Sequence, residues 1–176
     1  AATGQTTVPT ADVLLARTAG YAPPTLPGQS ATLLGDGRWL LMGGLEGGRV
    51  LKTVQTYDAS TGETSVLPAV LATGRAYHTA TVLPDGTVLV LGGESAAGVP
   101  MRSAERFDPI AERFITVSNI AVLVRSRHTA TLLTDGRLVI AGGTSAARAP
   151  MAEIEIVDGT SLAIAPLAPR LVAARS

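Results

Sequence analysis

Two histidines, His78 and His128, are the residues with the most evident chemical potential. An imidazole titrates near neutral pH and serves as a general base or as a transition-metal ligand. The two lie 50 residues apart, and each begins the same sequence, His-Thr-Ala-Thr. Because residues one repeat apart occupy equivalent positions in neighbouring structural units, the sequence favours a structural role over metal binding or catalysis. We expect each imidazole to hydrogen-bond to backbone where two units meet.

Five charged residues are candidates for a binding face, because they lie in or next to three segments that each follow a Gly-Gly pair. Binding residues often lie on loops that a rigid scaffold holds in place, and these segments differ in sequence while their surroundings repeat. The alternative is that the charges are ordinary solvated loop residues. The candidates are Glu46, Arg49, Glu94, Arg102 and Arg148.

Several kinds of catalytic site require residues that the sequence lacks. The 176 residues include no cysteine, which excludes disulfides, zinc-thiolate sites, iron–sulfur clusters and cysteine nucleophiles. No glycine-rich phosphate loop is present, and neither a Gly-x-Ser-x-Gly elbow nor a calcium loop occurs. We therefore predict no cofactor and no metal, and the sequence favours a non-enzymatic protein over an enzyme.

Length and composition predict one folded unit with a substantial core. Hydrophobic residues make up 46% of the chain and charged residues 16%, which is too apolar for a disordered segment. Fourteen basic and fourteen acidic residues cancel, so no net field attracts nucleic acid or an anionic membrane. The aliphatic runs, such as 120–124, are far shorter than the ~18 residues of a membrane span. The first residue is Ala1 and not methionine, so the sequence begins either after processing or at an arbitrary boundary in a longer chain. Under the first of these alternatives we expect an exported protein, extracellular or periplasmic.

An internal repeat organises the chain and accounts for most of its acidic turns. The Gly-Gly pairs recur after 49 and then 50 residues, at Gly43-Gly44, Gly92-Gly93 and Gly142-Gly143. An Asp-Gly dipeptide precedes each pair, and a segment ending in Asp follows it. Six of the seven aspartates occupy these two positions, so we assign them to turns and strand ends: Asp36, Asp85, Asp135, Asp58, Asp108 and Asp158.

Each repeat predicts four short antiparallel strands. Asp-Gly favours a type I′ turn, so each repeat is expected to open with a hairpin. The second strand of that hairpin is apolar throughout and must be covered on both faces; it is predicted at 39–42, 88–91 and 138–141. A third strand is predicted at 53–58, 103–108 and 153–158, and a weaker fourth at 64–67, 113–117 and 162–165. Residues 13–17 are expected to supply one further outer strand.

Four short strands in about 50 residues are typical of a β-propeller blade. The repeat resembles the kelch motif of bacterial galactose-oxidase-like propellers in its Arg75-x-x-His78 start, its Asp85-Gly86 hairpin, its Gly92-Gly93 pair and its Glu105-x-Phe107-Asp108 box. The resemblance covers residues 26–176 and implies an all-β fold of kelch-like blades.

The sequence departs from the kelch pattern at several positions. The first copy has Leu26 and Gln29 where the others have arginine and histidine, Val157 replaces an aromatic residue, and the kelch tryptophan of the outer strand is missing. The copper site of galactose oxidase needs a tyrosine cross-linked to a cysteine. Without cysteine, that cofactor cannot form within this chain.

The period divides the chain into an N-terminal segment and about three blades. We expect the segment at 1–25, blade 1 at 26–74, blade 2 at 75–124, blade 3 at 125–174 and the start of a further repeat at 175–176. Arg75, Arg125 and Arg175 recur with the period, so they are expected to have a structural role between blades.

Three blades cannot close a ring, since known propellers have roughly 4 to 8. We therefore expect large apolar surfaces at the first and last blades, and such surfaces mark interfaces. The chain is then either an N-terminal piece of a longer propeller or one protomer of an assembly that completes the ring.

Two hypotheses about function follow. The first is a structural or interaction module whose partners are the remaining blades of the same protein, copies of itself, another protein or a glycan. The second is part of a carbohydrate-active enzyme similar to the sialic-acid mutarotases that use kelch propellers, with arginine and glutamate at a central pocket.

Overall fold

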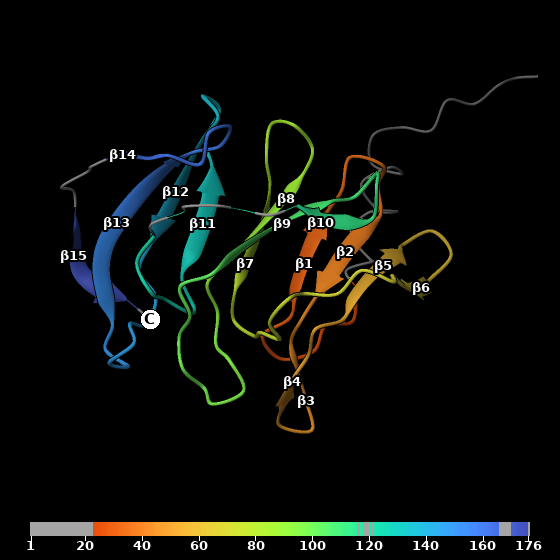
Figure 1. The fold of residues 1–176 in the computed structure, drawn as a ribbon, viewed down its shortest axis with the longest axis horizontal. Helices are drawn as coiled ribbons and strands as arrows, with labels where there is room; N and C mark the ends of the chain where they lie inside the picture. Colours follow the sequence, from red (N-terminus) through yellow and green to blue (C-terminus); the bar gives the residue numbers. More distant parts are fainter. Residues whose placement is uncertain (1–22, 116, 118–119, 121, 166–169, 176) are drawn as a thin grey trace, which may run out of the picture.

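The computed structural model describes residues 23–115, 117, 120, 122–165 and 170–175. Three antiparallel sheets follow one another in chain order, from blade 1 (orange) to blade 3 (blue) in Figure 1. Blade 1 contains β1 (Ser30–Leu33), β2 (Trp39–Met42), β5 (Val54–Asp58) and β6 (Glu63–Val66). Blade 2 contains β7 (Thr79–Val82), β8 (Val88–Leu91), β9 (Ala104–Asp108) and β10 (Arg113–Ile115). Blade 3 contains β11 (Thr129–Leu132), β12 (Arg137–Ala141), β13 (Met151–Asp158) and β14 (Ile164–Ala165). The prediction of propeller blades of four antiparallel strands is confirmed.

The first strand of each blade lies next to the first strand of its neighbour. β1 contacts β7, and β7 contacts β11, while β6, β10 and β14 end their sheets on the opposite side. This is the arrangement of blades around an axis, with β1, β7 and β11 innermost. Because β1, β7 and β11 are antiparallel to β2, β8 and β12, the loops after the glycine pairs lie at the end where the inner strands begin.

The turn after each first strand differs from the predicted type I′ turn. A type I′ turn needs positive φ at both central residues, but only the glycine of each Asp-Gly has it, as at Gly86 (φ 82°). Gly86 N donates to Leu83 O, and Leu83 N donates to Thr87 O, which is a three-residue loop closed by a left-handed glycine. The Asp85 carboxylate accepts the Thr87 amide at 3.1 Å. The aspartate has no positive φ, and for that reason the type I′ prediction is wrong.

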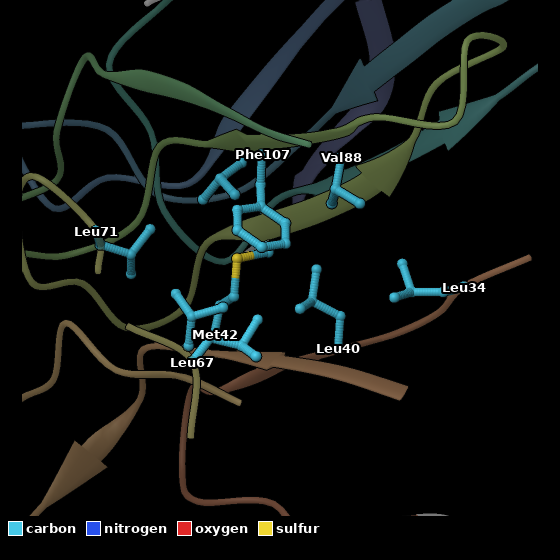
Figure 2. Packing of buried hydrophobic residues seen from close by; sticks show 9 residues of the cluster. Leu34, Leu40, Met42, Leu67, Leu71, Val88 and Phe107 are labelled. Atoms are coloured by element: carbon cyan, nitrogen blue, oxygen red, sulfur yellow. The ribbon is translucent and has the colours of Figure 1, made fainter. Parts of the chain in front are cut away.

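Two apolar cores fill the two seams, by which we mean the contact surfaces between blades 1 and 2 and between blades 2 and 3. In the first seam, Leu40 and Met42 of blade 1 point toward Phe107 and Val88 of blade 2 (Figure 2). In the second seam, Leu89 and Leu91, which alternate with the first-seam residues along β8, pack against blade 3. Their partners there are Leu138 and Ile140 of β12 and Val157 of β13. β8 is therefore buried on both faces, as its unbroken apolar sequence predicted.

Blades 1 and 3 each have one sheet face that does not pack against another blade in the described structure. These two faces are not equally buried. On blade 3, Val139 and Ala141 are half-buried, whereas Leu138 and Ile140 in the same strand are fully buried. On blade 1, Leu33 is 53% exposed, but Leu41 and Tyr57 are buried. The expected apolar surface is thus only partly exposed on blade 3, and the expectation is wrong for most of blade 1.

Two smaller elements complete the described fold. β3 (Leu45–Glu46) and β4 (Arg49–Val50) form a separate hairpin after the first glycine pair, which projects from blade 1 in Figure 1. β15 (Arg170–Arg175) pairs with β13, with Arg175 opposite Met151. One hundred residues earlier, at the equivalent positions, Arg75 N donates to Leu51 O at 3.1 Å. The outer strand expected at 13–17 lies outside the described residues.

Candidate functional site

Each histidine crosses a seam and bonds to a hydroxyl of the preceding blade. His78 Nε2 lies 2.9 Å from Ser30 Oγ of β1, and His128 Nε2 lies 3.0 Å from Thr79 Oγ1 of β7. The location at the seam agrees with the sequence interpretation, but the partner is a side-chain hydroxyl and not backbone. The reason is local: Ser30 and Thr79 begin the inner strand, directly beside the next blade's imidazole.

Both imidazoles are held in the neutral form by burial. Burial, with a smaller effect of the nearby Arg75 charge, lowers the pKa of His78 to about 3. Burial and the Arg125 charge lower the pKa of His128 to about 4. The second ring nitrogen, Nδ1, is buried without a hydrogen-bond partner in either residue within the described structure. An unpaired lone pair costs less than an unpaired N–H, so we infer that Nε2 carries the proton and donates to the hydroxyl.

A buried ion pair accompanies each histidine at the seam. Arg75 and Arg125 are 0% exposed. Arg125 donates to Gly142 O at 3.0 Å and to Glu155 Oε2 at 2.6 Å, both on blade 3. Arg75 makes the equivalent contacts with Gly92 O and Glu105 of blade 2. Their backbone carbonyls accept amides of the preceding blade, Gly44 N to Arg75 O at 2.9 Å and Gly93 N to Arg125 O at 3.1 Å. Both arginines therefore connect blades, and their buried guanidinium groups are not free to bind a ligand at the surface.

Tyr77 and Arg127 directly precede the two histidines and have an unusual backbone. Both have φ 56°, in the left-handed region, and the equivalent residue of blade 1 is Gly28 (φ 68°). Backbone bonds run from blade to blade through this position, from Tyr77 N to Gly28 O and from Arg127 N to Tyr77 O. Glycine adopts this conformation at lower cost than a residue with Cβ. The presence of a tyrosine and an arginine at these strained positions points to a use for their side chains.

The two side chains form a stacked cluster with Glu94, which we call the mouth. The Arg127 guanidinium carbon lies 3.6 Å from the centre of the Tyr77 ring, a cation–π contact. Arg127 Nε also donates to Glu94 Oε1 at 2.8 Å, and the Ser126 hydroxyl donates to the same oxygen at 3.0 Å. The hydrogen bond to Glu94 raises the pKa of Arg127 further, so the guanidinium stays cationic at every physiological pH.

Two open hollows adjoin at Arg127. One, of about 490 Å³, is lined by Tyr77, His78, Arg127 and His128. The other, of about 310 Å³, is lined by Glu94, Gly98, Pro100, Arg127, Thr144 and Arg148. Two arginines against one glutamate give the lining a net positive charge. Two guanidinium groups in the lining suit an anionic ligand of modest size.

The structure brings together two of the five candidate residues. Glu94 and Arg148 line the same hollow, although their loops are 50 residues apart in sequence. Glu46 and Arg49 face each other across the β3–β4 hairpin, and Arg102 is exposed beside β9; these three line neither hollow. Sequence reasoning missed Tyr77 and Arg127, and the available signal was their position before the repeated histidine, where the first copy has Gly28.

Metal and membrane features are not found in the described part of the chain. No three His, Asp or Glu side chains among those residues are grouped in a way that holds a metal ion. No helix there has the length and apolarity that crossing a bilayer requires.

Comparison with known proteins identifies the fold and no family. No protein-family model matches the chain, and no curated protein matches it. Among solved structures, the chain is similar to YjhT, with a TM-score of 0.72 and 15% sequence identity. The match covers 84% of this chain and 53% of YjhT, so the chain spans about half of that protein's length. At this identity the likeness concerns the fold alone, and it supports the β-propeller architecture.

Proposed function

We propose that the chain is a non-enzymatic interaction module in which the outward face of blade 3 binds a further propeller blade. This open face consists of Val139, Ala141, Ile154 and Ile156, which alternate with residues of the second seam. The further blade belongs either to a longer form of the same protein or to another chain.

The incomplete burial of Val139 is the observation that carries this proposal. Val139 occupies the same repeat position as Leu89, which is 1% exposed in the filled second seam, yet Val139 is only half-buried. Of its two cross-strand neighbours on that face, Ile156 is half-buried and Thr131 is exposed. A contiguous apolar sheet face of this kind marks an interaction surface.

The contacts at the mouth support the non-enzymatic character. Within the described lining of the two hollows, Glu94 is the one carboxylate, and it is bound to Arg127 and Ser126. The two histidines are held neutral, and each has one ring nitrogen bound to a hydroxyl. The lining therefore offers binding groups in preference to a free general acid or base.

We further propose that the repeats are of the kelch type found in bacterial galactose-oxidase-like propellers. The paired glycines favour this assignment, because a Cβ on Gly92 would lie 2.4 Å from Arg125 O and 3.0 Å from His128 Cε1. The Gly-Gly pair and the Arg-x-x-His start of the next repeat are thus parts of one packing unit.

Replacing Val139 with aspartate tests the interaction surface. We expect sedimentation velocity to show concentration-dependent association of the unaltered chain, driven by burial of the open face. Burying a valine side chain contributes about 1.5–3 kcal/mol, so Val139→Asp should weaken association at least about tenfold.

Val66→Asp is the matched control for this substitution. Val66 is 66% exposed and lies on β6 of blade 1, away from the open face, so its replacement should leave association unchanged. A chain that stays monomeric at every concentration, or equal effects of the two substitutions, would contradict the proposal.

The mouth favours a second candidate function, recognition of an acidic carbohydrate. Arg127, which stacks on Tyr77, and Arg148 offer cations that match a carboxylate. In this alternative the chain is part of a carbohydrate-active propeller enzyme similar to the sialic-acid mutarotases, with further blades supplying the missing catalytic groups.

Titration with N-acetylneuraminate, followed by NMR or calorimetry, tests this second candidate. Arg127→Ala should reduce the affinity at least about tenfold, because a charge-assisted hydrogen bond contributes about 1.5–3 kcal/mol. Arg102→Ala, an exposed arginine outside both hollows, should have no effect. If neither variant differs from the unaltered chain, the mouth is not the binding site.

A further inference from the structure

The two filled seams repeat one set of polar contacts. In each, the earlier blade provides a hydroxyl and the later blade an imidazole: Ser30 with His78, and Thr79 with His128. The later blade also provides the glutamate that binds the buried arginine, Glu105 or Glu155. A seam therefore has two unlike halves, a hydroxyl half and an imidazole–glutamate half.

The open face of blade 3 presents the hydroxyl half. Thr129 occupies the position of Ser30 and Thr79 at the start of the inner strand, and it is exposed. Its hydroxyl has one hydrogen bond in the described structure, a long one of 3.4 Å to Ala141 O of its own blade. It pairs with Ala141 of the apolar face, and Ala141 in turn pairs with Ile154.

The first blade lacks the imidazole–glutamate half. Gln29 stands at the histidine position, and its amide is already bound within its own blade, to Leu26 N at 3.1 Å and to Gly43 O at 3.3 Å. Gln55 stands at the position of Glu105 and Glu155. A second copy of this chain, docked with its blade 1 on blade 3, therefore offers no imidazole for Thr129 and no carboxylate at the ion-pair position.

We infer that the open face of blade 3 is specific for a blade that carries histidine and glutamate at these two positions, and that it discriminates against the chain's own first blade. This inference rests on the proposed function, since it names the partner of the same face. Contact between copies then relies on apolar area alone and is weaker than contact with a histidine-bearing blade.

The test extends the chain by one repeat. Residues 127–176 are repeated after Ser176, where Arg175-Ser176 matches Arg125-Ser126 and keeps the period. Burial of the open face is read from the labelling rate of a single cysteine at Ile156→Cys, against the unextended chain. We expect labelling to slow at least about tenfold in the extended chain.

A double-mutant cycle isolates the proposed contact. In the extended chain, Thr129→Ala and, separately, His128→Gln in the appended repeat should each speed labelling about fivefold, as loss of one hydrogen bond implies. The double variant should be no faster than either single variant. Thr129→Ala in the unextended chain should change nothing, which separates the contact from a general loss of folding.

The outcomes distinguish the two levels of the proposal. If the extended chain labels slowly and neither Thr129→Ala nor His128→Gln changes its rate, the preference for a histidine-bearing blade is overturned. The proposal that blade 3 has an interaction face then still holds. Labelling as fast in the extended chain as in the unextended one would overturn both.

Discussion

Replacing Arg125 with leucine is expected to lower the free energy of unfolding by about 3–5 kcal/mol. Arg125 is fully buried and binds Glu155 while donating to Gly142 O and Glu153 O. Its removal leaves a mostly buried carboxylate without its cation and takes one hydrogen-bond donor away from the Gly142 carbonyl. Urea unfolding followed by circular dichroism measures the change.

A surface pair and a double variant give the controls. Arg137→Leu breaks the Arg137–Asp135 pair, whose side chains are each 48% exposed, and should cost less than about 1 kcal/mol. The double variant Arg125→Leu/Glu155→Gln should be less destabilised than the sum of its single variants by at least about 2 kcal/mol. The first repeat of the chain already has leucine and glutamine at these two positions, Leu26 and Gln55. Additive single effects would show that Arg125 and Glu155 do not act as a pair.

Acidification from pH 7.5 to pH 5 is expected to remove about 4 kcal/mol of stability through the two histidines. Their folded-state pKa values, about 3 and about 4, lie below the ordinary value of 6.5. The unfolded chain therefore takes up protons first as the pH falls below 6.5, and stability declines from there toward the folded pKa values. At pH 5 each histidine accounts for about 2 kcal/mol.

The aspartates do not obscure this pH window. Hydrogen bonds within their own turns lower the pKa of Asp36, Asp58, Asp108, Asp135 and Asp158 from 3.8, so their contribution is lost only below about pH 4. His128→Gln, which copies the first blade's Gln29, should halve the loss between pH 7.5 and pH 5. An unfolding midpoint that is the same at both pH values would contradict the burial of the imidazoles.

The strands could be predicted because their causes are local. The unbroken apolar sequence of β8 requires cover on both faces, and the Asp-Gly and Gly-Gly positions mark where strands turn or end. The turn type was wrong because the aspartate's capping bond, visible only in three dimensions, outweighs the preference of the dipeptide.

The site was harder to predict because its residues meet through tertiary contacts. Nothing in the sequence near Arg127 indicates that it stacks on Tyr77 and binds Glu94, 33 residues away. The seam arginines could be assigned to a role between blades from their period, but their glutamate partners lie 30 residues further on. Only the folded arrangement of two successive blades reveals the pairs.

Thiol labelling at one repeat position in two blades tests the central claim most directly. Ala104 packs against the filled second seam, and Ile154 has the equivalent position on the open face; the chain has no other cysteine. We predict that Ile154→Cys labels much faster than Ala104→Cys in dilute protein and slows as the concentration rises, when the face becomes covered. Equal, slow labelling of both cysteines in dilute protein, or fast labelling of Ile154→Cys at every concentration, would contradict a blade-binding face on blade 3.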